Sequence, residues 1–141
     1  RRLGVVPQNG QHCGEQMAIA PGMLMREWTE GERRYLEYEM GTPIINFYSW
    51  LSATDGVGDH WNDVLLQVFY HGAHGINVPR MVQGMKDSLD YFSNNFGPYQ
   101  HKQARILEFP GYASFAQSFP NTIPFAESIG FNADNSDPED S

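Results

Sequence analysis

Apolar and polar positions alternate along the first half of the chain as they do in β-strands. Residues 33–40 read RRYLEYEM, with apolar side chains at every second position from Leu36 to Met40 and carboxylates between them, which predicts a half-exposed strand. Residues 43–53 and 63–71 are aromatic or β-branched on both faces, which predicts buried strands. The first half is therefore expected to be an antiparallel β region. Further strands are expected at residues 16–20 and 23–28.

The spacing of apolar residues changes to three and four in the segment 77–97, which is typical of a helix. Asn77 suits the N-cap, because its side-chain oxygen can accept a hydrogen bond from an amide of the first turn. Gly97 can adopt the backbone conformation that ends a helix, and Pro98 prevents continuation. A strand is expected to follow at residues 104–109. The apolar stripe of the helix comprises residues 78, 81, 82, 85, 89, 92 and 96.

Residues 111–126 carry no charge and are interrupted by prolines. The stretch is too short and too polar for a membrane span, and it predicts two short strands around a turn at Pro120 and Asn121. Glu108 and Glu127 flank it, and a carboxylate beside an uncharged, amide-rich wall could bind the ammonium group of a substrate. The ordinary alternative is that Glu108 projects from a strand edge and Glu127 pairs at the surface, and it is favoured for either residue alone.

The net charge of −8 is uneven, because four carboxylates crowd the last eight residues with no basic residue among them. A nucleic-acid partner is not expected, since phosphate binding needs a basic face and none is present. The single cysteine, Cys13, excludes an internal disulfide. The first residues lack the apolar segment of a signal peptide. The 141 residues have the usual size of one domain or parts of two.

Two histidines, His71 and His74, could bind zinc together with a third ligand from elsewhere in the chain. The glycines around them would hold such a site poorly, so polar loop residues are the favoured interpretation. The chain contains no HExxH, no GxSxG, no Walker loop and no dinucleotide fingerprint, and no catalytic residue is assigned. Trp28, Trp50 and Trp61 could form a carbohydrate platform, but they fall in separate segments, which favours core packing.

Two long strings, FGPYQHKQ (96–103) and AQSFPNTIPFAE (116–127), are more specific than any short motif in the chain. Within residues 85–131 they resemble the entry into the catalytic domain of zinc aminopeptidases of the membrane alanyl aminopeptidase family, which are gluzincin metallopeptidases. The similarity is greatest to the bacterial branch in which the peptidase is joined to an ABC-type transporter permease. Residues 18–53 and 61–81 resemble the end of that family's N-terminal β domain.

The resemblance implies an α+β fold in which the antiparallel end of a saddle-like N-terminal domain precedes one long helix and short strands that start a thermolysin-like domain. It also implies that a cleft wall, the string 116–127, occupies the place of the family's G-A-M-E-N motif, although no glutamate stands at the expected position of that string here. The implied substrate-binding residues are Gln117, Ser118, Phe119, Pro120 and Asn121. The implied divisions are an irregular segment 1–16, the β domain 17–74, the start of the catalytic domain 75–131, and an acidic tail 132–141.

For the full-length parent the resemblance implies zinc as the cofactor, a peptide substrate from which N-terminal residues are removed, and a transporter-permease portion with membrane association. HExxH and the third zinc ligand are absent from this sequence. The chain is therefore expected to be a piece of a longer peptidase, and this piece by itself is expected to be inactive and to bind no zinc. Two alternatives remain. One is a non-catalytic β-rich module that binds peptides or glycans; the other is a metal site built from His71, His74 and another residue.

Overall fold

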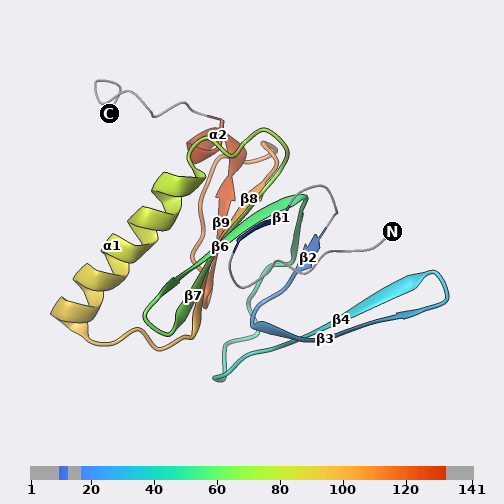
Figure 1. Ribbon diagram of the computed structural model, residues 1–141, viewed down its shortest axis with the longest axis horizontal. Coiled ribbons are helices and arrows are strands. Elements are labelled where there is room, and N and C mark those ends of the chain that lie inside the picture. Colours follow the sequence, from blue (N-terminus) through green and yellow to red (C-terminus); the bar gives the residue numbers. More distant parts are fainter. Residues whose placement is uncertain (1–9, 13–16, 133–141) are drawn as a thin grey trace.

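The computed structural model describes residues 10–12 and 17–132 and has an α+β fold, as predicted (Figure 1). Its centre is a five-stranded mixed sheet in the order β1-β6-β7-β8-β9. The strands of this sheet are β1 (Gly10–His12), β6 (Asp55–Trp61), β7 (Val64–Tyr70), β8 (Gln103–Phe109) and β9 (Thr122–Ala126). The other elements are β2 (Met17–Ile19), β3 (Met23–Glu30), β4 (Arg33–Glu39), β5 (Leu51–Ala53), α1 (Val78–Phe96) and α2 (Glu127–Gly130).

Strands β7, β8 and β9 run parallel to one another, whereas β1, β6 and β7 pair antiparallel. Helix α1 is the crossover connection between β7 and β8, as a parallel pair requires. The carboxyl ends of the three parallel strands therefore meet at one edge of the sheet. The loop 71–77, Glu108 and the start of α2 lie at this edge, because they end or follow these strands.

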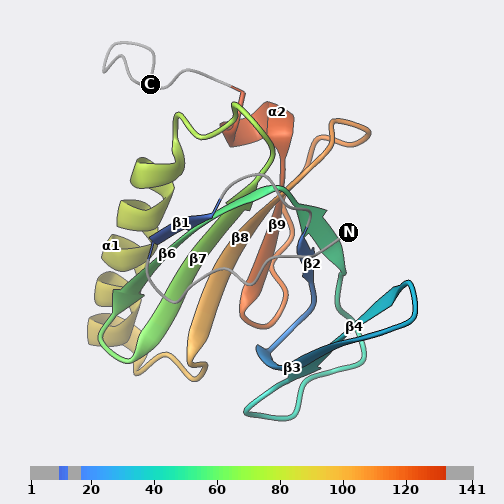
Figure 2. The ribbon, with the colours of Figure 1, turned by 45° about the vertical axis from the view of Figure 1, so that its right-hand side comes forward.

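Strand β7 is buried along its whole length because its two faces pack in different core clusters, and α1 lies on one side of the sheet (Figure 2). Leu66 and Val68 belong to a core cluster that includes Met85 of α1. Phe69 belongs to a second cluster, which Leu107 of β8 shares with residues of β2 and β5. The continuous apolar run in this segment thus predicts the buried strand correctly, since a strand covered on both faces needs no polar side.

Helix α1 has its N-cap at Asn77 and its C-cap at Gly97, as predicted. The side chain of Asn77 does not cap the helix; its Nδ2 donates to the carbonyl oxygen of Gly130 at 2.7 Å. The buried stripe ends at Leu89, and Phe92 and Phe96 are 57 % and 76 % exposed. The last turns of α1 therefore lie outside the core. Within the described part of the chain, neither helix has the length and apolar character needed to cross a membrane.

The predicted strand at 43–53 is wrong for residues 43–50, since only residues 51–53 pair, as β5 with β2. Ile45, Phe47 and Trp50 are 70 %, 60 % and 74 % exposed. Their composition is that of a buried strand, but the described part of the chain leaves these three side chains largely exposed. Burial depends on neighbouring elements as much as on residue type, which is why strand propensity fails at this segment.

Two strands, the short β1 and the longer β6, form where the sequence pattern does not predict them. β1 lies in the stretch 1–16 that was expected to be irregular, and it pairs antiparallel with β6. β6 reads DGVGDHW, so glycines and charged residues hide its period, while backbone pairing needs no apolar side chain. The expected division between residues 74 and 75 falls in the connection between β7 and β8, which are neighbours in the sheet. The expectations for residues 1–9, 13–16 and 133–141 concern segments outside the described residues.

The alternation predicted for residues 33–40 is confirmed in β4, where exposed and half-buried side chains alternate. β4 pairs with β3 in a separate two-stranded sheet. Gly31 has a φ of 61° in the turn between β3 and β4, and Gly22 has a φ of 93° at the opposite end of the pair. Both glycines therefore occupy backbone conformations that other residues rarely adopt.

We expect Gly22→Ala to destabilise the β3–β4 pair by about 2–3 kcal/mol and Gly31→Ala by about 1 kcal/mol. A Cβ atom at position 22 would lie 2.3 Å from the carbonyl oxygen of Glu39, whereas nothing lies within 4 Å of one at position 31. Because the clash is with backbone, no side-chain rotation relieves it. Hydrogen exchange of the β3 and β4 amides measures the two losses, and equal losses would contradict the steric argument.

Candidate functional site

The uncharged stretch forms a hairpin at the outer edge of the central sheet. Residues 115–119, hereafter the edge strand, pair antiparallel with β9 through the bridges Ala116–Phe125 and Phe119–Thr122. The hydrogen bonds run from the N–H of Gln117 to the oxygen of Pro124 at 3.1 Å, from Phe119 to Thr122 at 2.8 Å, from Thr122 to Phe119 at 3.1 Å, and from Ala126 to Phe115 at 3.1 Å.

The hairpin reverses direction at Pro120 and Asn121, where the sequence predicts a turn. Asn121 has a φ of 54°, in a region that asparagine tolerates better than most residues. Pro120 suits the first central position of a turn whose second central residue has a positive φ. The predicted turn is thus confirmed, and one of the two strands expected around it is β9, whereas the other is limited to two isolated bridges.

Alternate backbone groups of the edge strand face away from the sheet. Residues 115, 117 and 119 supply the groups that bond to β9, and in an antiparallel pair the groups of the residues between them point outward. No hydrogen bond among the described residues uses the N–H of Ala116 or Ser118. Residues 114–118 are all exposed. The edge strand therefore presents free backbone donors between uncharged side chains.

The five residues that the family resemblance implies as a cleft wall, 117–121, occupy different positions in this hairpin. Gln117 and Ser118 are exposed on the edge strand, and Phe119 and Pro120 are half-buried. The ring of Phe119 packs against that of Phe47 with centroids 5.0 Å apart. Asn121 is 7 % exposed and its Nδ2 donates to Oε1 of Gln103 at 3.2 Å, so its side chain is engaged inside the protein.

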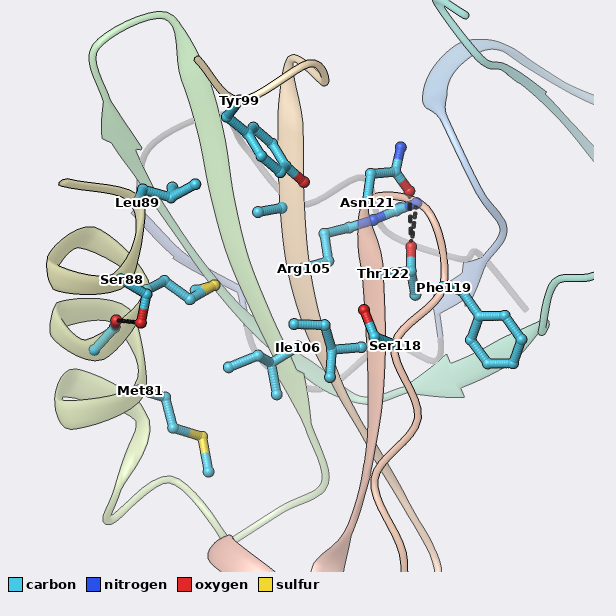
Figure 3. A pocket seen from close by; sticks show the side chains of 14 residues that line it. Met81, Ser88, Leu89, Tyr99, Arg105, Ile106, Ser118, Phe119, Asn121 and Thr122 are labelled. Atoms are coloured by element: carbon cyan, nitrogen blue, oxygen red, sulfur yellow. Dashed lines mark hydrogen bonds between the residues drawn. The ribbon is translucent and has the colours of Figure 1, made fainter. Parts of the chain in front are cut away.

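A cavity of about 460 Å³ lies between α1 and the hairpin (Figure 3). Met81 and Leu89 line it from α1, Ile106 from β8, and Ser118 from the edge strand. The cavity exists because α1 packs mainly on β6 and β7 and leaves the β8–β9 side of that face less covered. Most of its lining is apolar. The cavity thus opens beside the edge strand and offers room for an apolar group.

A chain of buried polar groups crosses the sheet beneath the hairpin. Gln103 donates from Nε2 to Oε1 of Gln67 at 3.0 Å and accepts from Asn121. Thr122 donates its hydroxyl to Oδ1 of Asn121 at 2.9 Å and accepts from Nη2 of Arg105 at 3.2 Å. Gln67 is the single interior polar residue of a strand that is otherwise apolar, and that was the one sequence signal for this network.

Arg105 ends this network and is 2 % exposed. Its Nη2 also donates to the carbonyl oxygen of Ala20 at 2.6 Å, while Nε has no hydrogen-bond partner among the described residues. Burial lowers the pKa of the guanidinium to about 10, although Tyr38 and Tyr99 oppose the shift. The residue thus carries a charge into the interior and holds β8 to the segment after β2.

His74, Glu108 and Glu127 come together at the carboxyl ends of the three parallel strands. One nitrogen or oxygen of each lies within 4.8 Å of the others. Glu108 is 1 % exposed, so the interpretation that it projects from a strand edge is wrong. His74 Nδ1 hydrogen-bonds Oε1 of Glu108, and the backbone N–H of His71 donates to Oε2 at 2.6 Å. A glutamate between Leu107 and Phe109 is a signal that sequence alone could have supplied.

The three tryptophans have different surroundings. Trp28 stacks on Tyr35, Trp50 stacks on Tyr48, and no ring contact among the described residues joins one tryptophan to another.

The sequence matches no protein-family model and no curated protein. The site must therefore be interpreted from its own geometry.

Proposed function

We propose that the edge strand 115–119 binds an extended peptide by strand addition, as one wall of the substrate cleft of a zinc aminopeptidase. The observation that carries this proposal is the pair of outward backbone positions at Ala116 and Ser118 on an exposed, uncharged edge. A peptide strand laid against such an edge forms main-chain hydrogen bonds that do not depend on its sequence. This suits a peptidase that accepts many substrates.

The order of elements supports the finer assignment. A β region, one long helix, and strands that end in an uncharged hairpin follow one another as the family resemblance implies for the start of a thermolysin-like domain. The resemblance also places the substrate wall in the string 116–127, which contains most of the edge strand. The lack of charge is consistent with this role, because charged side chains would attract solvent and favour one class of peptide.

Catalysis would require the two histidines and the glutamate of an HExxH motif and a distant third ligand, and this sequence contains no HExxH. In such peptidases zinc polarises the scissile carbonyl and activates water, and a glutamate acts as general base. The residues of this chain would orient the peptide main chain beside that centre. A non-catalytic peptide-binding module would use the same edge strand, and the DNA sequence after the codon for Ser141 distinguishes the two. HExxH followed by a distant glutamate supports the peptidase, and a stop codon supports the binding module.

Ser118→Pro is expected to weaken peptide binding at least about tenfold, the equivalent of about 1.4 kcal/mol. Proline removes the outward N–H of residue 118, and proline is tolerated on edge strands where the lost N–H faces solvent. Fluorescence anisotropy with a labelled, unstructured heptapeptide measures the change. Ser114→Pro is the matched control, because it lies just before the paired segment and should leave affinity unchanged.

The ligand offers a second control. The same heptapeptide with N-methyl groups at alternate positions cannot pair with the edge strand on its methylated side, so its affinity for the unaltered protein should fall. Equal binding of the methylated and unmethylated peptides, together with an unaffected Ser118→Pro variant, would contradict strand addition at this edge.

A further inference from the structure

The cluster of His74, Glu108 and Glu127 is built from three separate elements. His74 lies in the loop after β7, Glu108 is near the end of β8, and Glu127 directly follows β9. Ligand sites in open sheets commonly form outside the carboxyl ends of parallel strands, where loops from neighbouring strands converge. The three side chains meet at such a place, with their donor atoms within 4.8 Å of one another.

No lysine or arginine among the described residues balances the charges of this cluster. The side chain of Glu108 is fully buried, and its one ion pair within the described part of the chain is with His74. Glu127 is half-buried and accepts a hydrogen bond from the N–H of Gly111 at 2.8 Å. Among the described residues, neither carboxylate forms an ion pair with a lysine or an arginine. Buried charges are normally paired or coordinate metals, so two neighbouring carboxylates beside a single imidazole call for a cation.

We propose that His74, Glu108 and Glu127 bind a first-row divalent metal ion, for which Zn²⁺ is the probe. One imidazole nitrogen and two carboxylate oxygens are ligands that zinc accepts, and three protein ligands leave a fourth position for water or another donor. The imidazole favours Zn²⁺ over Mg²⁺ and Ca²⁺, which prefer ligand sets made of oxygen alone. This site is independent of the zinc centre that the family resemblance implies, and of the proposed peptide binding.

The surroundings of the carboxylates fit this assignment. The backbone N–H groups of His71 and Gly111 each hold one carboxylate in place, which is the kind of outer hydrogen bond that orients metal ligands. A Cβ atom at position 111 would lie 2.7 Å from Oε1 of Glu127. The missing side chain of Gly111 thus makes room for the carboxylate to turn toward Glu108 and His74.

A metal here would fasten both ends of the hairpin that carries the edge strand. Glu108 precedes the hairpin and Glu127 follows it, while His74 joins both to the loop before α1. Metal binding to the folded chain stabilises it by mass action. Zn²⁺ should therefore raise the melting temperature of the protein after treatment with a chelator.

Isothermal titration of the chelator-treated protein with Zn²⁺ tests the site. We expect one strong site per chain, with an affinity that falls at least about tenfold in Glu127→Gln and in His74→Gln, since even loss of an outer hydrogen-bond partner costs that much. Both residues are partly exposed, so the variants should fold, as circular dichroism would verify. Glu37→Gln, an exposed carboxylate on β4, is the control and should bind Zn²⁺ as the unaltered protein does.

Gly111→Ala is the sharper variant, because it removes no ligand. Its added methyl group must displace the Glu127 carboxylate, which is the far end of a flexible side chain, so Zn²⁺ affinity should fall while the melting temperature without metal changes little. Absence of a Zn²⁺ site, or a site of unchanged affinity in Glu127→Gln and His74→Gln, would overturn the proposal. Equal affinity for Mg²⁺ would also overturn it, because a site that does not distinguish Mg²⁺ from Zn²⁺ does not use the imidazole.

Discussion

Leu66→Ala should lower the free energy of unfolding by about 3–4 kcal/mol, within the range measured for leucine truncations in protein cores. Leu66 is 0 % exposed and lies on β7, which has a neighbouring strand on each side. The truncated side chain would leave a cavity in the core cluster that also contains Val82 and Met85 of α1, and the helix cannot move closer without disturbing the rest of the cluster. Urea denaturation followed by circular dichroism measures the loss as a shift of the midpoint at constant slope.

Ile45→Ala is the matched control for this truncation. Ile45 is 70 % exposed in the segment before β5, and truncation of an exposed side chain is expected to change stability by less than about 0.5 kcal/mol. Because single domains are stable by only about 5–15 kcal/mol, the loss at Leu66 is a large part of the total. Similar effects of the two variants would mean that the core does not lie between β7 and α1.

Arg105→Ala is expected to destabilise the protein by about 3–5 kcal/mol, the combined cost of the cavity that it leaves and of the lost hydrogen bonds. The substitution empties the volume of a side chain that is 2 % exposed. It also leaves the oxygens of Ala20 and Thr122 without the guanidinium that donates to them. Arg105→Met keeps most of the volume and removes a desolvated charge, so it should cost only about 1–2 kcal/mol, mainly for the lost hydrogen bonds.

The pH dependence of these two proteins provides the critical measurement. The folded-state pKa of Arg105 is lowered to about 10, below its value in the unfolded chain. Between that pH and the unfolded pKa, the unfolded chain holds a proton that the folded chain has released, so stability rises with pH by about 1.4 kcal/mol per unit from this residue. The difference between the unaltered protein and Arg105→Met should therefore shift by about 1.4 kcal/mol in favour of the unaltered protein between about pH 9 and 11. A difference that does not change with pH would show that the guanidinium is well solvated.

Elements whose character is local are well predicted from this sequence. The apolar spacing and the caps identify α1 within one residue at each end, because a helix satisfies its hydrogen bonds within itself. The apolar run of β7 and the alternation of β4 are likewise local patterns that match how each strand is covered. The turn at Pro120 and Asn121 follows from the conformations that these two residues prefer.

Segments whose burial depends on distant partners are predicted poorly. Residues 43–50 have the composition of a core strand and are largely exposed, while the glycine-rich β6 joins the central sheet. In both cases the deciding factor is which element lies alongside. Pairing and covering layers are set by the whole chain, and no window of sequence contains them.

The candidate sites also differ in whether local sequence or distant contacts determine them. The sequence by itself determined the helix, the main strands, and an uncharged hairpin whose backbone edge could face a peptide. Only the tertiary structure decided that His74, Glu108 and Glu127 converge and that Arg105 is buried. The reason is that β7, β8 and β9 run parallel, so their carboxyl ends lie side by side. Residues far apart in the chain meet there, as the hydrogen bond between Asn77 and Gly130, 53 positions apart, shows.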